Sequence, residues 1–116
     1  MKTVVLEVMS AEDATADFLR AWKSGQGDGA EHIGFATPEL LWKVLTAKRW
    51  ELLKAMAGAG PLGVRELARR AGRDVKGVHT DAMKLAQAGV IERTSDGKLL
   101  FPYERVDVRF SLNAAA

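Results

Sequence analysis

Hydrophobic and polar positions alternate at both ends of the chain and follow a helical period between the ends. Residues 2–8 alternate with Val4, Leu6 and Val8 on one side, and residues 105–112 alternate in the same way. A period of two predicts strands with one buried face. A further short strand is expected over residues 32–36. Strands near both termini and helices between them predict an α+β chain whose terminal strands share a small sheet.

Two or three helical segments are expected before the middle of the chain. The first begins after Ser10 and stops at Gly25, and Thr37 followed by Pro38 marks the start of another. Thr46 is a candidate cap for a third segment, because the apolar period resumes after it. The pattern therefore leaves open whether residues 37–57 form one bent helix or two.

Residues 64–98 contain the most informative pattern. A short helix is expected over 64–71, followed by a tight break at Gly72 and a second helix over 74–88. Gly89 stops this helix, and a hairpin with strands over 90–94 and 99–101 follows. Ser95 to Lys98 form the turn of the hairpin. This order predicts a winged helix-turn-helix, in which the second helix enters the major groove of DNA. The expected fold class is thus α+β, a winged helix-turn-helix with an added N-terminal strand and helix and a C-terminal strand.

The expected organisation has three parts. Residues 1–36 form a strand-helix-strand element for dimer or partner contact, residues 37–101 form the winged helix-turn-helix, and residues 102–116 add a strand that packs with the first part. Charge supports this division. The first part holds three Lys or Arg against six Asp or Glu, whereas residues 37–100 hold twelve against seven. A basic excess attracts polyanions such as DNA, although helices also carry basic side chains for solubility alone.

The 116 residues include no cysteine, and 47% of them are hydrophobic. A reducing, cytoplasmic location is expected, because neither disulfides nor thiolate metal sites can form. No apolar run is long enough for a membrane span, and the N-terminus turns acidic too early for a signal peptide. The three tryptophans lie on amphipathic helices, where we expect core or interface positions; they are Trp22, Trp42 and Trp50.

The second helix of the 64–98 segment is the candidate DNA reader. Val75, Val78, Ala82 and Leu85 recur at helical spacing and are expected on one buried stripe. Polar and basic residues fall outside this stripe, and the hairpin and the start of the preceding helix add further cations. The predicted DNA contacts are Arg65, Arg73, Lys76, Gly77, His79, Thr80, Lys84, Arg93, Ser95 and Lys98. An ordinary solvated helix face is the alternative interpretation.

Enzyme motifs are not found in the sequence. The chain has two histidines, and His79 lies two residues from Asp81, a spacing at which helical side chains do not face each other. The glycine-containing loop at 25–29 lacks the strand-turn-helix context of a dinucleotide site. We therefore expect no catalytic residue, no cofactor and no metal site.

The segment also resembles winged helix-turn-helix regulators of the MarR/ArsR type. The positions that carry this resemblance are Glu66-Leu67-Ala68, Val78, Leu85, Gly89 and Ile91. The whole chain is similar to a small prokaryotic group of proteins regarded as DNA-binding. That similarity lies in Leu45-Thr46-Ala47-Lys48-Arg49 with Leu52-Leu53, Gly72-Arg73-Asp74 with Val78-His79 and Asp81, and Pro102-Tyr103. Gly77 departs from the group, where a larger polar residue is expected.

The resemblance implies a regulator that also has a second role. Members of the group are often encoded beside a toxin gene of the TumE type and are then regarded as antitoxins. The expected function is a sequence-specific transcriptional repressor that binds double-stranded DNA as a homodimer and also neutralises a toxin. Glu12 and Asp17 in the acidic first part are the candidate toxin contacts. The alternative is a winged helix used only for protein–protein assembly.

Overall fold

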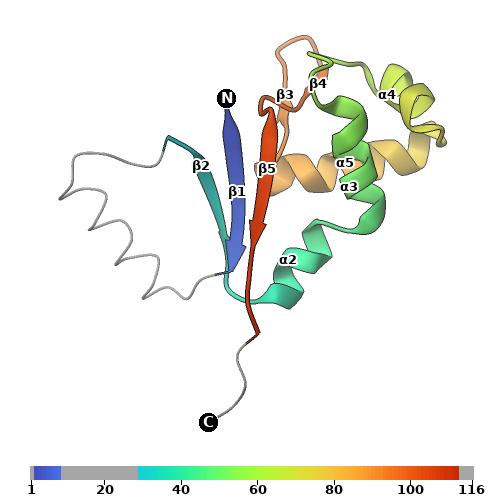
Figure 1. Cartoon of the computed structure of the whole chain (residues 1–116). Helices are drawn as coiled ribbons and strands as arrows, with labels where there is room; N and C mark the ends of the chain where they lie inside the picture. Colours follow the sequence, from blue (N-terminus) through green and yellow to red (C-terminus); the bar gives the residue numbers. More distant parts are fainter. Residues whose placement is uncertain (1, 9–28, 113–116) are drawn as a thin grey trace.

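Four helices and two small sheets make up residues 2–8 and 29–112, the part of the chain that this computed structural model describes (Figure 1). The elements are β1 (Thr3–Val8), β2 (Glu31–Phe35), α2 (Pro38–Val44), α3 (Ala47–Met56), α4 (Val64–Ala71), α5 (Val75–Gln87), β3 (Glu92–Arg93), β4 (Leu99–Leu100) and β5 (Arg105–Arg109). The predicted helix over 10–25 lies outside the described residues. The described chain is α+β, compatible with a winged-helix-like arrangement.

The terminal strands share one sheet, as the alternating patterns predicted. Its order is β2-β1-β5, and both pairs are parallel, with Thr3 opposite Arg105 and Val5 opposite His32. Parallel strands need long crossover connections, and the connection from β2 to β5 contains all four described helices. β5 ends at Arg109, three residues before the end of the predicted alternation, and Leu112 is 98% exposed.

The core lies between this sheet and the helices. Val4 and Leu6 of β1 are fully buried in one apolar cluster with side chains from every described helix and from the hairpin segment. The other members of the cluster include Leu41, Leu52, Met56, Leu67, Val78, Leu85, Val90, Leu99 and Phe101. The cluster therefore fixes the helices against the sheet and holds α5 by one side only.

Residues 37–57 form two helices, which settles the alternative that the sequence left open. Thr37 caps α2 by accepting a hydrogen bond from the Leu40 N–H at 3.2 Å, and Thr46 caps α3 by accepting one from the Arg49 N–H at 3.3 Å. Thr46 has an extended backbone, with φ −79° and ψ 166°. The chain leaves the helical conformation there because the threonine hydroxyl satisfies an N–H group of the new helix.

Replacing Thr46 by alanine is expected to destabilise the protein by about 1 kcal/mol, the usual cost of losing a helix cap. The matched control is Thr46→Ser, which keeps the accepting hydroxyl and should retain most of the stability. Urea unfolding followed by circular dichroism measures the difference. Equal stability of the alanine variant and the parent would contradict a capping role.

Helices α4 and α5 follow the sequence prediction closely. α4 ends at Gly72, whose φ of 68° is left-handed, and α5 begins after Asp74, whose carboxylate accepts a hydrogen bond from the Gly77 N–H at 2.8 Å. The expected stripe is buried at Val78, Ala82 and Leu85, whereas Val75 is 42% exposed and was wrongly included. Helical side chains lean toward the N-terminus, so a side chain in the first turn projects past the packed surface.

The hairpin is shorter than predicted. β3 and β4 contain two residues each, and Val90, Ile91 and Phe101, which were expected in the strands, are buried in the core outside the ladder. The Thr94 hydroxyl accepts a hydrogen bond from the Lys98 N–H at 2.9 Å across the turn. Leu62, before α4, forms a bridge with Leu99 and so attaches the hairpin to the helices. No helix in the described residues is long and apolar enough to cross a membrane.

Candidate nucleic-acid interface

The exposed side of α5 carries the polar residues that the sequence predicted. Lys76, His79, Thr80 and Lys84 are all exposed, opposite the buried stripe. They are separated by three, one and four residues, which places them on adjoining parts of one helical face. The Thr80 hydroxyl donates a hydrogen bond to the Lys76 carbonyl at 3.1 Å, so its oxygen keeps accepting capacity toward solvent.

The predicted contacts outside α5 are also on the surface. Arg65 is exposed in the first turn of α4, where the cap residue Gly63 offers no side-chain hydrogen bond to the helix N–H groups. The hairpin exposes three more, Arg93, Ser95 and Lys98. In contrast, Arg69 and Arg70 both pair with Glu66 on α4. The exposed cations of the predicted set thus lie on the start of α4, on α5 and on the hairpin, while other exposed lysines, such as Lys43 and Lys48, lie on α2 and α3.

Asp81 of α5 forms an ion-pair network that the sequence interpretation did not anticipate. One carboxylate oxygen accepts a hydrogen bond from Arg49 Nε at 3.0 Å, and the other accepts one from Arg73 Nη2 at 2.7 Å. Arg49 Nη1 also donates to the carbonyl oxygens of Lys43 and Val44 at 2.8 and 3.1 Å. The network therefore joins the end of α2, the start of α3, the turn after α4, and α5.

The charges in this network favour ionised Asp81. Burial raises the pKa of its carboxyl group, but the hydrogen bonds and positive charges of Arg73 and Arg49 outweigh burial and lower the pKa below its ordinary value. The side chains of Asp81 and Arg49 are each 14% exposed, and that of Arg73 is 22% exposed. Removing one partner of a salt bridge so shielded from water leaves the other charge uncompensated, which costs more than the loss of a surface pair.

The network changes the interpretation of Arg73. The sequence prediction made Arg73 a phosphate contact, whereas its guanidinium pairs with Asp81 and its Nη1 atom is buried without a hydrogen-bond partner. Arg73 thus acts as a positioning residue for α5, and a phosphate contact from it stays a prediction. One sequence feature pointed to this network: Arg49, Arg73 and Asp81 all occur in the segments that carry the family resemblance.

The presence of glycine at position 77 has a local structural explanation that does not involve DNA. A Cβ atom at this position would lie 3.0 Å from Asp74 Oδ1 and 3.3 Å from Arg73 Nη2. A side chain would therefore crowd the carboxylate that caps α5 and the arginine that holds Asp81. The close approach of DNA predicted at Gly77 stays a prediction.

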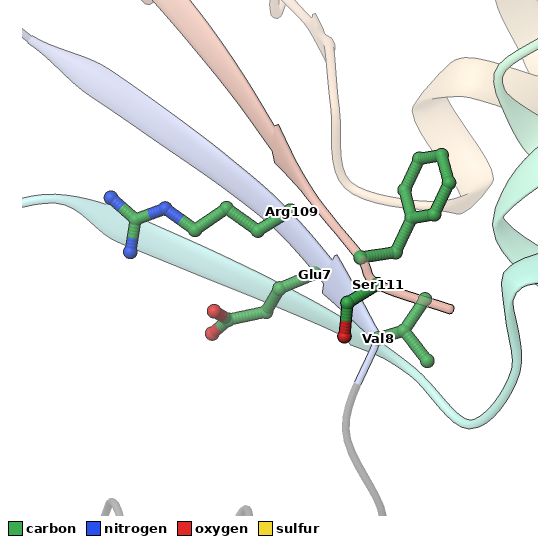
Figure 2. Close-up of a pocket in the computed structure, with 5 residues that line it drawn as sticks. Glu7, Val8, Arg109 and Ser111 are labelled. Carbon is green, nitrogen blue, oxygen red and sulfur yellow. The ribbon is translucent and has the colours of Figure 1, made fainter. Parts of the chain in front are cut away.

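A hollow of about 490 Å³ at the carboxyl ends of β1 and β5 is the other candidate site. Figure 2 shows the side chains of Glu7 and Arg109, which line it, extending on the same side of the sheet. Glu7 already forms a hydrogen bond with His32 at 2.7 Å. The described residues hold no group of three or more metal-binding side chains. The exposed face of α5 and the hairpin carry most of the predicted contact residues, so we take them as the candidate interface.

A match to one protein family covers the candidate interface and the three charged side chains of the network. Residues 44–108 match the model of the family described as HVO_A0114, from the last residue of α2 almost to the end of β5. This segment is more than half of the chain. No curated protein and no solved structure matches. The chain therefore belongs to the HVO_A0114 family.

Proposed function

We propose that this protein is a sequence-specific DNA-binding regulator, with α5 as the helix that reads the major groove. The observation that carries the proposal is the exposed face of α5, where Lys76, His79, Thr80 and Lys84 lie opposite a fully buried stripe. Cations on such a face contact phosphates, and short polar groups near the helix N-terminus reach base edges. The order α3, α4, α5 and hairpin supports a winged helix-turn-helix fold of the MarR/ArsR type.

The proposed mechanism involves no chemical step. The regulator binds its operator and represses transcription by occupying the promoter, and Arg65, Arg93, Ser95 and Lys98 add backbone contacts on either side of α5. A homodimer fits this mechanism, because two-fold symmetric operators match two-fold symmetric proteins. Toxin neutralisation, the second role implied by the family resemblance, has its candidate contacts Glu12 and Asp17 outside the described residues. The proposal therefore rests on DNA binding.

An electrophoretic mobility shift with the DNA upstream of the protein's own gene tests this function. Specific retardation, resistant to excess random DNA, is the expected result. Equal binding to random DNA, or no binding at low salt, would overturn the regulator and favour the alternative, a winged helix used only for protein–protein assembly.

Replacing His79 or Thr80 by alanine is expected to change the preference among DNA sequences, because these side chains lie near the start of α5. A real base contact contributes about 1–3 kcal/mol of discrimination. Competition binding with single-base variants of the operator provides the measurement. Gln87→Ala, an exposed polar residue at the other end of α5, is the matched control. Unchanged preference in both test variants would exclude this part of α5 as the reader.

A further inference from the structure

The outer edge of β5 has free backbone groups. In the described residues β5 pairs only with β1, and its first residue, Arg105, donates its N–H to the Lys2 carbonyl at 3.3 Å. Backbone groups of a strand alternate in direction, so those of Val106 and Val108 point away from β1. None of the backbone hydrogen bonds recorded for residues 2–8 and 29–112 reaches this side of β5. Such an edge is a template for another strand.

Apolar side chains lie beside this edge at both of its ends. Near the end of β5, Phe110 packs edge-on against Trp42 with ring centroids 5.7 Å apart, and the two residues remain 49% and 50% exposed. Near its start, a cleft of about 110 Å³ lies between α3 and β5, with Trp50, Leu53 and Val106 among its lining residues. Exposed aromatic residues around a free strand are typical of a protein–protein interface.

We propose that the partner on this surface is a second copy of the chain, with the two β5 strands antiparallel and the two-fold axis at Val108. The inference rests on the homodimer of the proposed function and gives it a defined surface. The arrangement joins the two three-stranded sheets into one sheet of six strands. Its central pair is Val108 opposite Val108, whose free N–H and C=O groups bond each other across the axis.

Charge along β5 selects this register. Arg105, Asp107 and Arg109 alternate with the valines on the face away from the core. With the axis at Val108, Asp107 of each copy lies directly opposite Arg109 of the other, which is a favourable cross-strand pair. With the axis at Asp107, Asp107 would lie opposite Asp107 of the other copy, and Arg105 would lie opposite Arg109 of the other copy. Those like-charge pairs are destabilising.

The aromatic residues distinguish the two remaining registers. An axis at Val106 would also pair opposite charges, but it sets Phe110 against Pro102, which has no N–H to donate, and leaves Leu112 beyond the paired strands. An axis at Val108 sets Phe110 opposite Val106 of the other copy, and Val106 lines the apolar cleft. Phe110, just after β5 of one copy, thus meets the cleft at the start of β5 of the other copy. The two-fold symmetry produces this contact twice.

The first experiment compares charge variants by light scattering over a dilution series. The parent should have twice the 12.6 kDa mass of the chain. Arg109→Asp should weaken the dimer by about tenfold or more, because each of two symmetric pairs becomes repulsive. The exchange variant Asp107→Arg with Arg109→Asp should recover dimerisation. Circular dichroism establishes that each variant is folded.

The second experiment uses the absence of cysteine from the sequence. Val108→Cys should form an intermolecular disulfide on mild oxidation, because cross-strand Cα atoms at the axis lie within disulfide range. Val106→Cys is the matched control and should not cross-link. Cross-linking of Val106→Cys alone would overturn the register. A parent dimer in which neither variant cross-links and Arg109→Asp has no effect would place the interface elsewhere. A monomeric parent would overturn the dimer, while the mobility shift reports on DNA binding independently.

Discussion

Replacing Lys76, Lys84 and Lys98 together by alanine is expected to make DNA binding weaker and much less dependent on salt. All three side chains are exposed, two on α5 and one at the hairpin turn. Each phosphate contact contributes about one unit to the slope of the logarithm of the binding constant against the logarithm of salt concentration. The slope should therefore fall by about three, with a similar loss for operator and random DNA. Fluorescence anisotropy over a salt series measures both quantities.

A control of equal charge makes this experiment specific. Lys43, Lys48 and Lys54 are exposed on α2 and α3, outside the predicted contact set. Their triple alanine variant changes the net charge by the same amount, so it reports the effect of overall charge alone. If both triple variants lower the slope equally, attraction of DNA by the whole protein would explain binding, and α5 and the hairpin would not form a defined interface.

Asp81→Asn is expected to cost about 2–3 kcal/mol of unfolding free energy, because it leaves two largely shielded guanidinium groups without their shared carboxylate. Operator affinity should fall as well, since α5 loses its attachment to α3 and to the turn after α4. Urea unfolding and anisotropy measure the two effects. Asp96→Asn, in the exposed hairpin turn, is the control and should cost much less. If Asp81→Asn left the unfolding free energy and the operator affinity unchanged, the apolar core alone would position α5.

The pH dependence of stability provides a separate test of this network. The pKa of Asp81 is lowered in the folded protein, so the pairing contributes its full stability above the ordinary pKa of 3.8 and loses it as the pH falls through the folded value. The difference in unfolding free energy between the parent and Asp81→Asn should be constant from about pH 7 to about pH 5 and shrink below about pH 4. A difference that grows on acidification would contradict the assignment.

The helical part of the fold could be predicted because its signals are local. Asp74 and Thr37 cap helices that begin at the next residue, and Gly72 supplies the left-handed turn that ends α4. A cap or a turn depends on residues within three or four positions of each other, so it can be recognised from one amino-acid sequence alone. The exposed face of α5 follows from the same local period, which is why Lys76 and His79 are found where the sequence placed them.

Long-range pairing decided the rest. Arg49 and Asp81 are 32 residues apart, and no spacing rule distinguishes their salt bridge from two solvated side chains. The same holds for Arg73, which the sequence assigned to phosphate and the structure directs to Asp81. The sequence by itself determined the helices, their caps and the polar face of α5, because these depend on neighbouring residues. Only the tertiary structure decided that β5 lies parallel to β1 with a free outer edge, and that two arginines hold α5, because packing between distant segments sets strand direction and ion pairing.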